Sequence, residues 1–395
     1  MQNKADPLLI LRGLACLAVF FWHIGPPKYY LVIKGINFSW ITFPSGLAAV
    51  WVFFILSGYL MGKIFFIGRY ALTKAGIMRF YLSRFLRIAP AYYLNILFLA
   101  IFIYPAFLRD RLPVFINLLT FRQTDFYPIA NFNSPIWTVS TEMQFFLLVP
   151  IFFALFSFIE KRLTLSILAG EAILILGFAI RAYITVHGVV WNAESYSVHV
   201  YTPLVANLDI FLFGFFLNLI VRGVKKNASA KFWNRLHGNL LGMVVTILSL
   251  LFLYFFANYN TIFVYSRFSS YREAVTYTLP FLACLVTGWY IVYFETLEKY
   301  SAYKKRIKLS VKSVMGKPVR LFEIVGILSF EIYIWHKAVI DIFGFTNYDV
   351  TSWAVFLQKA IPAFLITVLV SVATYFIVEK PVSKVRGYVI NRFAR

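Results

Sequence analysis

The stretch LLILRGLACLAVFFWHI, at residues 8–24, is apolar apart from Arg12 near its start and His23 near its end. Its length is close to the ~20 residues with which an α-helix crosses the hydrocarbon core of a bilayer. A charged side chain at the centre of that core costs about 2.5–3.5 kcal/mol, so such residues usually line a polar cavity or a site of chemistry. The stretch therefore predicts a membrane-spanning helix with a functional face.

The whole 395-residue chain has the same character, since 61% of its residues are hydrophobic and 14% are charged. Soluble domains carry about 25% charged residues. We therefore predict an all-α, polytopic integral membrane protein with about ten transmembrane helices and a single domain over residues 1–395. The second span is expected to tilt or break at Gly58. The expected spans are 8–25, 41–66, 88–108, 143–159, 164–184, 202–222, 238–258, 274–296, 322–343 and 355–378.

Basic residues are unevenly distributed among the segments that join these spans. If the N-terminus lies in the cytoplasm, the inner segments hold 25 Lys and Arg residues and the outer segments hold 7. Because Lys and Arg accumulate on the cytoplasmic side, both termini are predicted to be cytoplasmic, in a multi-pass protein of the inner (plasma) membrane. The net charge of +22 then follows from topology and from contact with anionic membrane lipid, and no nucleic-acid partner is expected.

The sequence contains no pattern typical of a metal site. Cys16 and Cys284 both fall within expected spans, so neither a disulfide framework nor a zinc site is expected. Asp110 and Asp125 stand alone, whereas a metal-dependent glycosyltransferase would need paired acidic residues in an outer loop. We predict no metal.

The topology gives polar residues from three spans a similar depth in the membrane. His23 is eleven residues beyond Arg12, which is about 16 Å along a helix and places it in the outer half. Glu142 comes early in the inward-running fourth span, and His336 comes late in the outward-running ninth. A histidine beside a carboxylate is the usual general-base arrangement, so His23 and Glu142 are the predicted catalytic residues. The alternatives are a solvated carboxylate for Glu142 and a packing role for His336.

Arg84 and Arg87 are expected at the opposite, cytoplasmic side, where the third span begins. Because they are three residues apart, they share one face of a helix and form a fork suited to phosphate groups. The alternative is that both side chains extend toward the interface, as basic residues at the ends of spans often do.

Six motifs resemble those of acyltransferase family 3, integral membrane enzymes that acylate sugar hydroxyls and similar acceptors. They are LRGLA at 11–15 followed by His23, FFILSGYL at 53–60, RFLRIAP at 84–90, WTVSTEMQF at 137–145, SFEIYIWH at 329–336 and EKP at 379–381. No single motif is specific, but six in the family's order identify the family over nearly the whole chain. Glu331 departs from the pattern, because the family often has a small or hydroxyl residue there.

The resemblance implies a membrane O-acyltransferase that takes an acetyl or other short acyl group from cytosolic acyl-CoA, most often acetyl-CoA. In this family the Arg and the His of the first span are functionally important, and the matching residues here are Arg12 and His23. The family's paired arginines are implicated in handling the acyl donor, and the matching residues here are Arg84 and Arg87. Glu142 matches the acidic residue of the fourth span. The acceptors are surface polysaccharides or lipid-linked sugars, so a carbohydrate partner is expected.

Together these features predict that His23, positioned by Glu142, removes a proton from a sugar hydroxyl while Arg12, Arg84 and Arg87 bind acetyl-CoA. Candidates for contact with the substrate or the transition state are Trp137, Ser140, Tyr333 and His336. Direct transfer and transfer through an acylated His23 fit the same residues. The main alternative is a transporter or flippase of a lipid-linked sugar, and a polytopic glycosyltransferase and a non-catalytic scaffold are two more.

Overall fold

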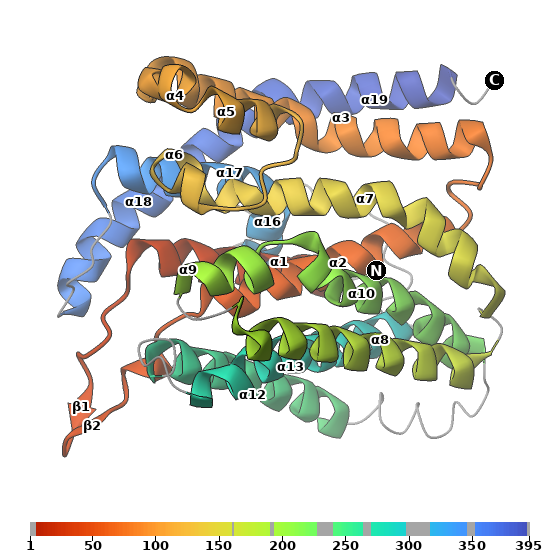
Figure 1. Cartoon of the computed structure of the whole chain (residues 1–395), viewed down its shortest axis with the longest axis horizontal. Coiled ribbons are helices and arrows are strands. Elements are labelled where there is room, and N and C mark those ends of the chain that lie inside the picture. The colour runs from red at the N-terminus through yellow and green to blue at the C-terminus, as the bar shows by residue number, and fades with distance from the viewer. Residues whose placement is uncertain are drawn as a thin grey trace.

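The computed structural model describes residues 5–159, 162–189, 193–226, 240–263, 270–297, 317–345 and 352–392. In Figure 1 the long helices run side by side across the view, and two short strands lie at its left edge. These strands, β1 (Val32–Ile33) and β2 (Ile36–Asn37), pair as an antiparallel hairpin. Both labelled chain ends lie in the right half of the view, away from the hairpin. Which end faces the cytoplasm stays a prediction from the distribution of Lys and Arg.

The helices fall into three groups by length and type. The long α-helices are α1 (Pro7–Ile24), α2 (Gly46–Phe66), α3 (Lys74–Phe98), α7 (Trp137–Phe156), α8 (Leu163–Ile184), α10 (Leu204–Lys226), α12 (Leu240–Phe263), α13 (Ser270–Thr296) and α18 (Trp353–Thr374). The shorter ones are α4 (Pro105–Asp110), α5 (Leu112–Leu119), α6 (Ala130–Asn133), α9 (Ala193–Tyr196), α16 (Arg320–Ile327), α17 (Ser329–Ile342) and α19 (Lys380–Arg392). Single turns of 3₁₀-helix are η1 (Ser39–Ile41), η3 (Tyr127–Ile129), η4 (Ser134–Ile136) and η5 (Ser157–Ile159), and π-turns are η2 (Leu99–Ile103), η6 (Thr185–Val189), η7 (Ser197–Tyr201) and η8 (Tyr375–Glu379).

Nine helical segments of the described residues are long and apolar enough to cross a membrane. The prediction of an all-α polytopic membrane protein is therefore confirmed. The expected span 322–343 is not one continuous helix: α16 and α17 are separated at Leu328, whose ψ is 4°. There the Ser329 hydroxyl donates to the Gly326 carbonyl at 2.9 Å, a local bond of the kind that competes with regular helix hydrogen bonding.

The third span also differs from the prediction, because α3 begins at Lys74 rather than near residue 88. The Thr73 side chain caps it by accepting from the backbone N–H of Gly76 at 3.1 Å, and the helix continues through Pro90. Its first half carries several basic residues, which lower the hydropathy of this part of the helix below that of an apolar span. Arg84 and Arg87 therefore lie inside a long helix and not at its entry.

The first helix begins and ends at residues suited to those positions. Asp6 accepts hydrogen bonds from the backbone N–H groups of Leu8 at 3.0 Å and Leu9 at 3.3 Å, as an N-cap does. Pro7 occupies the first turn, where its missing N–H costs nothing. Gly25 ends the helix with φ of 82°, a left-handed conformation that glycine adopts without strain. These signals fix the start of α1 and so the relative height of Arg12 and His23.

Close glycine contacts bring the central helices together. A Cβ on Gly13 or Gly326 would lie 2.1 Å from a backbone carbonyl oxygen of the other helix, where α1 crosses α16. Likewise a Cβ on Gly58 would lie 2.0 Å, and one on Gly214 2.1 Å, from a carbonyl oxygen across the α2–α10 crossing. Small residues allow such close approach of membrane helices. Gly58 is therefore a packing site in a continuous α2, and the predicted break there is wrong.

A buried ion pair joins α8 to α10. The Arg181 guanidinium donates to both carboxylate oxygens of Asp209 at 2.8 Å and to the Ala206 carbonyl at 2.9 Å. The two side chains are only 3% and 7% exposed. Hydropathy alone gave no sign of this pair, because each charge is isolated within a long apolar stretch.

Candidate active site

A cavity of about 360 Å³ lies between α1, α2, α3, α7 and α17. This volume is within the range of about 300–1,000 Å³ typical of small-molecule sites. Its lining residues include one carboxylate, Glu142, and five basic side chains: Arg12, Lys63, Arg69, Arg84 and Arg87. Such an excess of positive charge inside a membrane protein favours an anionic ligand.

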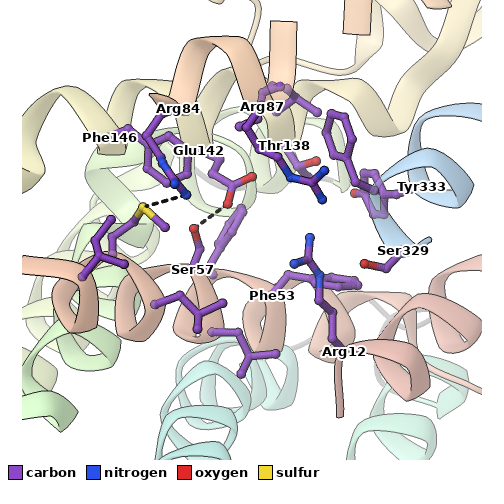
Figure 2. Close-up of a pocket in the computed structure, with 18 of the residues that line it drawn as sticks. Arg12, Phe53, Ser57, Arg84, Arg87, Thr138, Glu142, Phe146, Ser329 and Tyr333 are labelled. Carbon is purple, nitrogen blue, oxygen red and sulfur yellow. Dashed lines mark hydrogen bonds between the residues drawn. The ribbon is translucent and has the colours of Figure 1, made fainter. Parts of the chain in front are cut away.

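Two of the arginines face each other across this cavity. Arg12 on α1 and Arg87 on α3 point toward one another (Figure 2). The Nε atoms of Arg12 and Arg84 are buried without a hydrogen-bond partner among the described residues. Like charges that face each other repel. An anion between them would offset the repulsion and use the unpaired donors.

The predicted fork of Arg84 and Arg87 is present, but its two members have different partners. Arg87 forms an ion pair with Glu379, the last residue of η8. Arg84 forms no ion pair among the described residues, and two of its contacts are long: 3.9 Å from Nη1 to Met61 Sδ and 3.4 Å from Nη2 to Ser83 Oγ. Arg84 therefore has the greater capacity to bind an incoming anion.

Glu142 lies in the same cavity as the arginines. It is on the second turn of α7, and its carboxylate accepts a hydrogen bond from the Ser57 hydroxyl of α2 (Figure 2). The predicted separation in depth between Glu142 and the arginine pair is therefore wrong. Because α3 begins at Lys74, Arg84 and Arg87 lie well inside this helix, where they line the same cavity as Glu142.

A second cavity, of about 280 Å³, adjoins the first and shares four residues with it: Arg12, Leu56, Leu60 and Lys63. Lys63 donates to both carboxylate oxygens of Glu295, at 2.7 and 2.8 Å. Asp6 also lines this second cavity, and burial raises the pKa of its carboxyl. The Lys63–Glu295 ion pair thus lies where one cavity passes into the next.

The two predicted histidines contact each other. His23 Nδ1 is 3.1 Å from His336 Nε2, and the ring centroids are 4.9 Å apart at an interplanar angle of 61°. His23 is in the last turn of α1, and His336 is on α17 with 1% of its surface exposed. The prediction that these spans bring both histidines to one depth is consistent with this contact.

The expected hydrogen bond between His23 and Glu142 is not formed in the described part of the chain. The His23 ring instead has the Val19 carbonyl, at 2.9 Å, and His336 as its partners. Tyr333 lies between the arginine cavity and the histidine pair, since it lines that cavity and its ring centroid is 5.6 Å from that of His336. The reason is geometric: Glu142 faces α2 and the cavity, whereas His23 faces α17.

The remaining predicted residues differ in position. Tyr333 lines the cavity together with Thr138. Trp137 packs against the rings of Phe54 and Tyr201, with centroids 6.1 and 5.2 Å away, and Ser140 is fully buried. Neither of the last two is among the residues that line the cavity.

Sequence reasoning assigned no role to three residues of this region. Ser57 lies in the motif FFILSGYL and Glu379 in the motif EKP, so the motifs pointed to these two residues without giving them a role. Lys63 lies three residues beyond the end of FFILSGYL and carried no signal of its own. Glu331, the departure from the family pattern, is fully buried, and neither of its carboxylate oxygens has a partner among the described residues.

A family model described as an acyltransferase domain matches residues 8–378. Peptidoglycan O-acetyltransferase OatA of Listeria monocytogenes serovar 1/2a (strain ATCC BAA-679 / EGD-e) is 29% identical over 180 residues, which are 42% of this chain and 27% of that protein. Acyltransferase MdmB of Streptomyces mycarofaciens is 30% identical over 162 residues, 38% of this chain and 40% of that protein.

The chain therefore spans less than half the length of these two relatives. No solved structure matches the chain. The family model, in contrast, covers nearly all of it, including the arginine cavity and both histidines. The chain belongs to acyltransferase family 3.

Proposed function

We propose that this protein is an O-acyltransferase of the inner (plasma) membrane that moves an acetyl or other short acyl group from cytosolic acyl-CoA to a carbohydrate hydroxyl. The observation that carries the proposal is the basic cavity with Arg12 and Arg87 facing each other and Arg84 without an ion-pair partner among the described residues. Guanidinium groups suit phosphates, and coenzyme A carries several of them. Membership of the family supports acyl transfer as the reaction.

The donor would enter from the cytosol through the second cavity. Its phosphates would bind Arg84 and Arg87, and its pantetheine arm would extend past Arg12 toward Tyr333. Leu56 and Leu60, which line both cavities, offer apolar walls for that arm. Glu142 would limit the repulsion among the arginines when the donor is absent.

The acceptor is a hydroxyl of a surface or lipid-linked carbohydrate that arrives from the outer side. The name of the Listeria relative, a peptidoglycan O-acetyltransferase, supports a carbohydrate of the cell envelope. His23 would meet it, because this residue is in the last turn of α1, beyond Arg12 along the helix.

In the reaction, His23 takes the proton of the acceptor hydroxyl, and the oxygen attacks the thioester carbonyl carbon. The carbon–sulfur bond then breaks, and the imidazolium returns the proton to the leaving thiolate. The negative end of the α1 dipole stabilises the imidazolium. Tyr333, which lines the cavity, is placed to donate to the oxyanion of the tetrahedral intermediate.

The test uses purified protein in lipid nanodiscs with acetyl-CoA carrying a labelled acetyl group. Release of free coenzyme A is followed together with mass spectrometry of an added envelope-carbohydrate fraction. His23→Ala should lower turnover by about 10²-fold or more without changing the affinity for acetyl-CoA. The matched control is His187→Ala, because His187 is exposed and stacks on Tyr183 away from the cavity.

Two outcomes would contradict the proposal. If His23→Ala turned over like the wild type, His23 would not be the base. If the wild type released no coenzyme A but moved a labelled lipid-linked sugar across vesicle membranes, the transporter or flippase alternative would be correct.

A further inference from the structure

We infer that His336 is a positioning residue that holds His23 in the tautomer with its proton on Nδ1, leaving Nε2 free to act as the base. The inference rests on the proposed role of His23. It is carried by the four hydrogen-bond contacts of the two rings, which together leave one arrangement of protons.

The arrangement begins at His336. Its Nδ1 is 2.7 Å from the Tyr333 carbonyl oxygen and 3.2 Å from that of Ile332. Carbonyl oxygens only accept hydrogen bonds, so this nitrogen must carry a proton. In a neutral imidazole the other nitrogen then has a lone pair and accepts. Nε2 of His336 is therefore an acceptor.

The same reasoning then applies to His23. Its Nδ1 is 2.9 Å from the Val19 carbonyl and 3.1 Å from Nε2 of His336. Both of these atoms accept, so Nδ1 of His23 must donate, and its single N–H is shared between them; Nε2 of His336 adds to the preference that the Val19 carbonyl alone would give. The proton is thereby fixed on Nδ1, and Nε2 has a free lone pair. A wrong tautomer would put a proton on the atom that has to remove one.

The surroundings hold the His336 ring in this orientation. Phe20 and Tyr333 contact it at centroid distances of 6.4 and 5.6 Å, and Phe20 is fully buried. The adjacent Lys337 forms an ion pair with Asp341, one turn later on the same helix. Few polar atoms therefore compete for Nε2 of His336. The pair resembles the base-and-orienter unit of other enzymes, with an imidazole in the place of a carboxylate.

Two substitutions of His336 separate the acceptor from the donor. A glutamine amide oxygen reaches the place of Nε2 and can accept from His23, whereas an asparagine amide reaches only the place of Nδ1 and can donate to the Tyr333 carbonyl. His336→Gln should keep turnover within about tenfold of wild type, and His336→Asn should lose about 10²-fold or more in kcat, with KM for acetyl-CoA unchanged in both. A residue with only a packing role would lower stability as side-chain volume falls, which thermal unfolding measures, and would not lower kcat selectively in a folded His336→Asn variant.

Three controls keep the result interpretable. Thermal unfolding in detergent shows whether each variant is folded, and His187→Asn, an exposed site on η6, should behave as wild type. His23→Ala is measured alongside. If it retains activity, the proposed base fails; if it is inactive while His336→Asn is active, only the positioning role fails. Equal loss in folded Gln and Asn variants would also overturn it.

A second measurement does not depend on activity. The chain has 5 histidines, so ¹⁵N spectra of histidine-labelled protein in bilayers are simple enough to assign His23 by its loss in His23→Ala. The wild type should show His23 protonated at Nδ1, and in His336→Asn, where only the Val19 carbonyl still accepts from Nδ1, the share of this tautomer should fall. A His23 signal protonated at Nε2 in the wild type would refute the inference.

Discussion

The two arginines of the α3 fork should differ in what their removal does. Arg84→Ala should weaken acyl-CoA binding strongly while changing the stability of the protein little. Arg87→Ala should weaken binding less and destabilise the protein as well. The difference follows from their partners, because Arg87 is paired with Glu379 and Arg84 forms no ion pair among the described residues.

The magnitudes follow from the contacts. A hydrogen bond between a guanidinium and a phosphate contributes about 1.5–3 kcal/mol, so loss of Arg84 should raise the Kd about 10- to 150-fold. Removing Arg87 leaves the Glu379 carboxylate, whose side chain is 14% exposed, without its cation. That should cost about 1–3 kcal/mol of stability, because a largely desolvated charge loses its partner.

The assay is isothermal titration of acetyl-CoA into each variant at fixed salt, since ionic strength screens these interactions. Thermal unfolding is measured on the same samples. Arg79→Ala is the matched control: Arg79 is on α3 too, but its Nε bonds the Ala75 carbonyl at 3.3 Å and it does not line the cavity. Wild-type affinity in Arg84→Ala, or an equal loss in Arg79→Ala, would refute the assignment of the cavity as the donor site.

Glu142→Gln removes the carboxylate that lines the arginine cavity, so acetyl-CoA should bind about threefold more tightly or better; weaker binding in the same titration would contradict this. Asp209→Ala leaves Arg181 charged and buried and should lower the free energy of unfolding by about 3–5 kcal/mol, whereas Arg181→Met combined with Asp209→Leu should restore most of it, as measured by chemical or thermal unfolding. Gly58→Ala should lower the melting temperature because its Cβ has no space at the α2–α10 crossing, while Gly170→Ala, with nothing within 4 Å, should not. Equal melting temperatures for the two glycine variants would show that the crossing can relax.

The sequence by itself determined the class of the molecule and drew attention to most of the charged residues that line the arginine cavity. Apolar length predicted nearly all the spans, and spacing within one helix placed His23 about three turns beyond Arg12. These are local properties, because hydropathy and helical periodicity depend on residues close together in the chain. The motifs predicted the family for the same reason, since each is a short run of residues.

Only the tertiary structure decided which of these residues meet. His23 pairs with His336 across 313 positions, and Glu142 binds Ser57 across 85, although the sequence favoured His23 with Glu142. Depth along a helix is readable from sequence, but the direction in which a side chain faces depends on the rotation of each helix against its neighbours. That rotation is set by close contacts such as the one at Gly58, where two backbones approach within a distance that no larger side chain permits.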